Sequence, residues 1–216
     1  MDHVLKNLNA VADALENQEA PNFSSLAQTI YHENNKIHNR GYTNGFNIYR
    51  INGEYAVAIT EAYLRILNSK KANHEIREKA AQGLSIIALF IKPIRAIYED
   101  WAIQVRNRIE TDPSSYVRVS LLDMLSKFGD SSDTEWLIGL FQRYRDEIWH
   151  YVSDIAYSTD TRAGAVPIST WMWALATTGA FDQAFPLIEE ILKTNDHPVL
   201  GPLETASSIL GYLWRM

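Results

Sequence analysis

Apolar residues recur at steps of three and four along most of this chain of 216 residues, and that spacing predicts amphipathic α-helices. The clearest run is Asp133–Tyr157, whose apolar face consists of Leu137, Leu140, Phe141, Tyr144, Ile148, Val152 and Ile155. The same pattern predicts helices over Asp2–Asn17, Asn22–Glu33, Glu54–Asn68, Asn73–Lys92, Pro93–Glu110, Ser114–Phe128, Pro167–Thr178, Phe181–Thr194 and Gly201–Arg215. We therefore expect an all-α fold.

Glycine and proline fall mostly between these segments. Only 10 glycines and 7 prolines are present, too few for an all-β fold with many short strands and turns. Asp112, which precedes Pro113, is expected to cap the helix that follows, and Gly129 is expected to end it. The chain has no cysteine, which excludes disulfides, thiolate metal sites and cysteine nucleophiles.

One segment, His32–Gly53, departs from the helical pattern. It is rich in asparagine, contains three glycines and shows weak helical periodicity. We expect an irregular loop that leads into a helix at Glu54, with a short hairpin over Phe46–Ile51 as the alternative. Loops of this length in compact domains are commonly functional or mobile.

The charges are distributed unequally along the chain. Residues 1–108 carry 13 basic and 11 acidic side chains, whereas residues 109–216 carry 7 basic and 15 acidic ones. The acidic half is either an ordinary solvated surface or one that steers a basic partner. Nucleic-acid binding is not expected, because contacts with phosphates need a basic stripe.

The sequence also bears on location. Residues 1–7 contain no basic segment followed by an apolar stretch, so no signal peptide is expected. The longest apolar run, Leu84–Ile91, contains Ser85 and is far shorter than the roughly 20 residues that span a bilayer. We expect a cytoplasmic protein that does not enter a membrane.

Parts of the sequence repeat. Ile76-Arg77 and Val117-Arg118 lie 41 residues apart, and each pair comes near the start of a predicted helix. Asp112-Pro113 has a relative in Asp196-His197-Pro198, 84 residues later. A period near 42 residues with two helices per unit is typical of stacked helical hairpins.

The segment from Asp112 to Asp130 resembles a HEAT repeat. It begins with Asp-Pro, continues with Val117-Arg118 and apolar positions, and closes with Phe128-Gly-Asp. The resemblance covers about residues 73–216 and implies a right-handed α–α superhelix of stacked hairpins, of HEAT or armadillo type. We expect a single α-helical domain over 1–216, in which residues 1–72 add N-terminal helices and the irregular 32–53 loop. Arg118 is expected to lie beside the next repeat and to pair with Asp123 or Asp154.

No motif identifies a reaction. Glu147-x-x-His150 has the spacing found in di-iron bundles, but no second copy is present. Gly41–Gly45 lacks the Lys-Ser/Thr of a phosphate loop. We nominate no catalytic residue, no metal ligand and no cofactor. Any of the predicted helices could still carry an aspartate or glutamate that acts as a general acid.

The polar face of Asp133–Tyr157 is the candidate binding surface. It combines charged and aromatic side chains, the composition of interface anchors, and a second acidic group follows on Phe181–Thr194. The predicted partner-binding residues are Arg143, Asp146, Glu147, Trp149, His150, Tyr151, Asp154, Asp182, Glu189 and Glu190. The alternative is an ordinary solvated face, with Trp149 packed on a neighbouring helix.

These observations predict a protein-binding module, and within that class a small acidic inhibitor or immunity-type protein that binds a basic partner. Two other classes stay open. One is an enzyme on a helical-repeat scaffold, a lyase or a hydrolase, which would need a deep pocket with perturbed pKa values. The other is a structural subunit of a larger assembly, which would associate through an uncapped last repeat. The sequence does not determine the oligomeric state.

Overall fold

A computed structural model describes residues 2–41, 53–88, 95–128, 131–140 and 142–143, and the single positions 174, 175, 178, 182, 183, 185, 186 and 189. Within these residues the secondary structure is entirely helical, as expected. The helices are α1 (Asp2–Asn17), α2 (Phe23–Gly41), α3 (Gly53–Asn68), α4 (His74–Ala88), α5 (Arg95–Thr111) and α6 (Ser115–Phe128), followed by the 3₁₀ turn η1 (Ser131–Asp133). None of the described helices has both the length and the apolar character needed to cross a bilayer.

The chain divides into two compact units, residues 1–124 and 125–216, and the boundary falls inside α6. Each unit is described by itself. The expectation of a single domain over 1–216 stays a prediction. Most described residues belong to the first unit, which holds α1 to α5 and most of α6.

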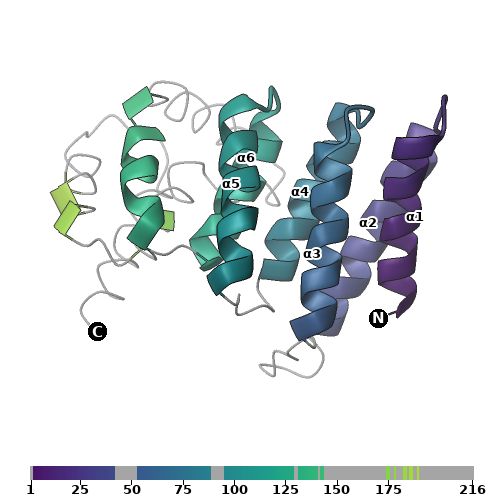
Figure 1. Ribbon diagram of the computed structural model, residues 1–216, viewed down its shortest axis with the longest axis horizontal. Helices are drawn as coiled ribbons and strands as arrows, with labels where there is room; N and C mark the ends of the chain where they lie inside the picture. The colour runs from purple at the N-terminus through teal and green to yellow at the C-terminus, as the bar shows by residue number, and fades with distance from the viewer. Residues whose placement is uncertain are drawn as a thin grey trace, which may run out of the picture. The chain divides into compact units, whose positions relative to one another are not determined.

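The helices of the first unit pack as pairs in two layers (Figure 1). α1 packs on α2 and α3 packs on α4, while α1 also contacts α3 and α2 also contacts α4. Hydrogen bonds extend both layers: Asn68 of α3 reaches Gln104 of α5 at 2.8 Å, and Ser85 of α4 reaches Asp123 of α6. Odd-numbered helices therefore form one layer and even-numbered helices the other. This arrangement is compatible with a helical-repeat fold.

The buried face of α1 illustrates why these segments are helical. Its core positions are Val4, Leu8, Val11 and Leu15, at steps of four, three and four, and each is at most 2% exposed. That spacing places all four side chains on one side of the helix. Burying a side chain of this size contributes about 1.5–3 kcal/mol, so packing rather than helix propensity holds α1 in place.

Side-chain caps fix where the helices begin. Asn22 Oδ1 accepts a hydrogen bond from the Ser25 amide at 3.1 Å, and Asn73 Oδ1 accepts one from the Ile76 amide at 3.0 Å. At α6 the predicted cap is displaced by two residues. Ser114 Oγ accepts the Val117 amide at 3.5 Å, while Asp112 Oδ1 accepts the Ser114 amide at 3.0 Å. Ser114 is therefore the N-cap, and Asp112 braces the turn before it.

The expected loop over residues 32–53 is wrong in its first part, because α2 continues to Gly41. Residues 42–52, where the alternative hairpin falls, lie outside the described residues. The core positions in the second half of α2 are Ile30, Glu33, Asn34 and Ile37, all at most 2% exposed. The buried positions keep the spacing of a helix, but two of them are polar. A pattern of apolar residues therefore does not predict this part of the helix.

Gly83 lets α4 approach the side chains of α2 and α3 closely. A Cβ atom at this position would lie 2.4 Å from the Tyr63 ring and 2.7 Å from Asn34 Oδ1. Both neighbours are buried, so neither can move aside without disturbing the core.

Replacing Gly83 with alanine tests this packing. We expect Gly83→Ala to lower the free energy of unfolding by about 1–3 kcal/mol, because the added methyl group overpacks the core. Urea denaturation followed by circular dichroism measures the change. Gly139→Ala is the control, since among the described atoms its Cβ would meet only Arg143 Nη1 at 3.9 Å. It should be neutral or stabilising by about 0.5–1 kcal/mol, and equal losses in both variants would contradict the close approach.

Candidate functional site

The structure describes three of the ten predicted partner-binding residues. Arg143, Asp182 and Glu189 are helical and exposed, as a binding surface requires. The other seven, Asp146, Glu147, Trp149, His150, Tyr151, Asp154 and Glu190, lie outside the described residues. The predicted surface therefore stays a prediction, and the geometry below comes from the first unit.

A buried ion pair joins α4 to the turn between α5 and α6. Arg77 Nε donates to Asp112 Oδ2 at 2.8 Å, and Arg77 Nη1 donates to the Ala72 carbonyl at 2.8 Å. Arg108 Nη1 lies 3.8 Å from the same Asp112 oxygen. The Asp112 side chain is fully buried, and both its oxygens accept hydrogen bonds from protein groups, Oδ1 from the Ser114 amide and Oδ2 from Arg77. Such a carboxylate positions helices and does not present a reactive group to solvent.

This ion pair connects two successive copies of the repeated sequence motif. Arg77 follows Ile76 in the earlier copy, and Asp112 belongs to the Asp-Pro that precedes the later copy. Ser114 strengthens the same junction, because its hydroxyl donates to Glu78 Oε1 at 2.6 Å. The corresponding pairing of Arg118 stays a prediction. Its expected partner Asp123 accepts a hydrogen bond from Ser85, and the other, Asp154, lies outside the described residues.

A second polar cluster lies in the core of the first four helices. Glu33 Oε1 accepts hydrogen bonds from Asn7 Nδ2 at 2.9 Å and from Lys36 Nζ at 2.6 Å. Beside it, Tyr63 donates its hydroxyl proton to Asn34 Oδ1 at 2.5 Å. Asn34 Nδ2 in turn donates to the Lys79 carbonyl at 2.9 Å. The chain of bonds links α2 and α3 to the backbone of α4.

The electrostatics of this cluster follow from its burial. Loss of solvation and the neighbouring Glu33 carboxylate both raise the pKa of Tyr63 well above its ordinary value. Tyr63 therefore keeps its proton at neutral pH and acts as a hydrogen-bond donor there. Glu33 Oε2 is buried and has no hydrogen-bond partner among the described residues. A buried carboxylate that is half satisfied costs stability, and the ammonium of Lys36 offsets part of that cost.

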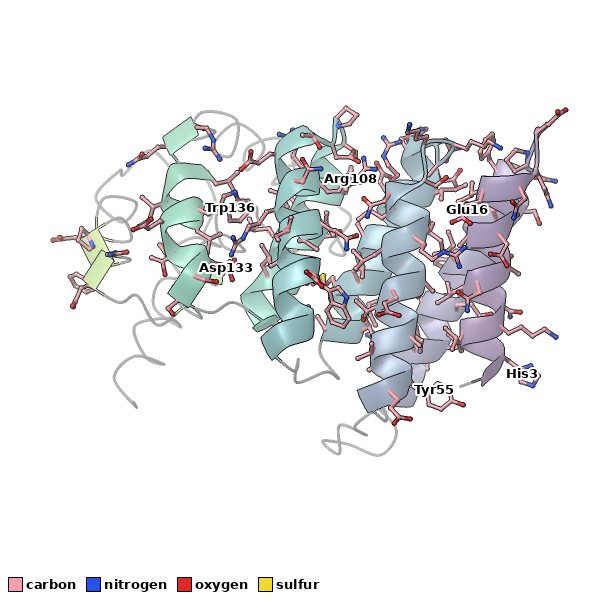
Figure 2. All side chains as sticks on the ribbon, viewed as in Figure 1. His3, Glu16, Tyr55, Arg108, Asp133 and Trp136 are labelled. Carbon is pink, nitrogen blue, oxygen red and sulfur yellow. The ribbon has the colours of Figure 1, made fainter. Side chains whose placement is uncertain are left out.

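A third network lies on the surface between α1 and α3. Arg65 Nη2 donates to Glu16 Oε2 at 2.8 Å and to Asp13 Oδ1 at 2.9 Å. Figure 2 places Glu16 near the end of α1, towards α3. Hydrogen bonds to Glu16 and Asp13 raise the pKa of Arg65, which is charged in any case. Because these side chains are well exposed, the network contributes little to stability.

The sequence pattern does not identify Glu33 and Asn34 as core residues, because they fall where the expected helix gives way to the expected loop. The usable signal was their spacing, since both lie between Ile30 and Ile37 at steps of three and four. Among the residues that the structure describes, no three acidic or histidine side chains are grouped to hold a metal ion. Comparisons with protein-family models, curated proteins and solved structures found no match to this chain.

Removing the buried carboxylate tests the Arg77–Asp112 ion pair. We expect Asp112→Ala to lower the free energy of unfolding by about 3 kcal/mol, because it leaves a mostly buried guanidinium without its partner. Asp13→Ala, which removes an exposed carboxylate from Arg65, is the control and should change stability by less than about 1 kcal/mol. Urea denaturation measures both, and similar small effects would show that the buried pair does not hold the turn.

The Tyr63 hydroxyl predicts a specific pH dependence. We expect Tyr63→Phe to cost about 1–3 kcal/mol near neutral pH, because it leaves Asn34 Oδ1 without its donor. The pKa of Tyr63 is higher in the folded than in the unfolded state. The contribution of the Tyr63 hydroxyl to stability is therefore fully present below about pH 10, the pKa of tyrosine in the unfolded chain. It is lost as the pH rises towards the pKa of Tyr63 in the folded protein. The stability difference between wild type and variant should narrow above about pH 10, and a constant difference would contradict the raised pKa.

Proposed function

We propose that this chain is a protein-binding module built from HEAT-like helical hairpins. The observation that carries the proposal is the packing of helix pairs in two layers, joined through Arg77 and Asp112 at positions of the repeated motif. Helix pairs stacked in this way bury their apolar faces against neighbouring pairs and leave a long outer surface. Surfaces of this kind suit large partners better than small molecules.

The charge of the second half supports a basic partner. Residues 109–216 carry 15 acidic and 7 basic side chains, and the three described members of the predicted surface are exposed. An acidic surface speeds the association of a basic protein and disfavours acidic competitors. We propose a small acidic inhibitor or immunity-type protein that covers the active face of a basic toxin or enzyme.

The proposed interface consists of the ten predicted partner-binding residues, seven of them within 143–154 and three within 182–190. We propose the cytoplasm as its compartment, since a chain without cysteine needs no oxidising environment to fold. No cofactor is part of the proposal.

The first experiment identifies the partner and then measures binding with purified components. The tagged full-length chain is used as bait at low and at moderate salt, and captured proteins are identified by mass spectrometry. We expect one basic protein in stoichiometric amount, captured less efficiently as salt rises. The purified pair is then titrated calorimetrically. Capture of no protein at either salt concentration would contradict the proposal.

A charge reversal tests the interface itself. We expect Glu147→Lys to slow association with the captured partner by about tenfold at low salt, because it removes electrostatic steering. Glu61→Lys is the matched control: it makes the same charge change at an exposed position of α3 and should leave the association rate nearly unchanged. Stopped-flow or surface-plasmon measurements give both rates. Equal effects in the two variants would mean that the predicted residues do not form the interface.

A further inference from the structure

Helix α2 buries few apolar side chains. Among its described residues these are Ala27, Ile30 and Ile37, and the core positions between the two isoleucines are Glu33 and Asn34. Burial of apolar area has no preferred direction, and cores built only from apolar residues lose a unique arrangement before they lose stability. Apolar packing by itself therefore leaves the position of α2 along its neighbours loosely defined.

The hydrogen bonds of Glu33 and Asn34 define that position closely. Glu33 Oε1 accepts from Asn7 Nδ2 of α1 at 2.9 Å, and Asn34 Oδ1 accepts from the Tyr63 hydroxyl of α3 at 2.5 Å. Asn34 Nδ2 donates to the Lys79 carbonyl of α4 at 2.9 Å. These two residues therefore bond α2 to three other helices of the first unit (Figure 1).

The ion pair of Glu33 with Lys36 adds no such information. Lys36 Nζ lies 2.6 Å from Glu33 Oε1, but both residues belong to α2, so this contact survives any movement of the helix as a whole. A shift of α2 by one turn would keep the ion pair and separate Asn34 from Tyr63. That separation leaves two polar groups unpaired in the core, which is unfavourable.

We propose that the four polar side chains Asn7, Glu33, Asn34 and Tyr63 set the register of α2 against α1 and α3. Polar pairs in a core can be replaced by apolar side chains of the same shape with little change in stability, whereas one member left unpaired is strongly unfavourable. These side chains therefore disfavour the shifted arrangements more than they favour the native one. Their cost in the native arrangement is seen at Glu33 Oε2, which is buried and has no hydrogen-bond partner among the described residues.

Shape is the competing explanation for a fixed register. Gly83 lets the backbone of α4 approach the Tyr63 ring and Asn34 Oδ1 closely, and a close fit also positions helices. The test therefore removes polarity and keeps shape, because leucine has the branching of asparagine, methionine the length of glutamate and phenylalanine the ring of tyrosine. The apolar variant combines Asn7→Leu, Glu33→Met, Asn34→Leu and Tyr63→Phe.

Spin labels measure the register directly. The chain has no cysteine, so labels attach only at introduced ones. Lys6→Cys and Gln28→Cys place labels at exposed positions of α1 and α2, and Gln28→Cys with Glu61→Cys does the same for α2 and α3. Double electron–electron resonance gives the distribution of distances for each label pair, and urea denaturation of the unlabelled protein gives the unfolding midpoint.

We expect each label pair to give a single distance in the wild-type background. In the apolar variant at least one distribution should split or broaden by several ångström, since a shift of one helical turn moves α2 by about 5.4 Å. Its urea midpoint should stay the same or rise. The control, Asn9→Ala with Asp13→Ala, removes an amide and a carboxylate that both bond Arg65 at the surface, and it should keep a single distance.

Three results would overturn the proposal. An unchanged single distance for both label pairs in the apolar variant would show that shape positions α2. A lower urea midpoint, or an apolar variant that does not fold, would show that the four side chains supply stability rather than register. Glu33→Gln keeps an acceptor for the Asn7 amide without the charge, so it should retain one distance, and a split distribution in this variant would contradict the role of the matched hydrogen bonds.

Discussion

The ion pair between Arg77 and Asp112 ties α4 to the turn between α5 and α6. Asp112 lies in the turn between two helices and has no exposed side-chain surface, so its charge is tolerable only beside a fixed cation. Arg77 provides that cation from the preceding helix pair and also holds the Ala72 carbonyl. One side chain therefore closes two turns, one before α4 and one before α6. The two-layer packing of helix pairs depends on such joints, because each pair alone leaves an apolar face uncovered.

The sequence predicted the helices well where their buried faces are apolar. The bounds of α1 agree fully and those of α3, α5 and α6 to within two residues, because steps of three and four between leucine, isoleucine and valine leave little ambiguity. The expected helix ends at Glu33 whereas α2 continues to Gly41, because Glu33 and Asn34 occupy core positions that a hydropathy pattern assigns to solvent. Their burial is possible only because Asn7, Lys36, Tyr63 and the Lys79 carbonyl supply partners from other helices. No local pattern contains that information.

Long-range partners were the least predictable part of the site. The repeated Ile-Arg and Val-Arg pairs indicated an arginine that bridges to a neighbouring repeat, but not which carboxylate would receive it. Arg77 meets Asp112 across 35 residues, and the choice depends on how two turns come together in space.

Lys79 also has a mechanical consequence. Its carbonyl accepts the Asn34 amide while its ammonium lies over the Tyr31 ring, so one residue is attached to α2 at both its backbone and its side chain. Sliding α4 along α2 by one helical turn, about 5.4 Å, would break both attachments and bring a residue with a side chain, Lys79 or Ile87, to the place that Gly83 occupies against the Tyr63 ring. These two helices are therefore expected to move as one stiff body.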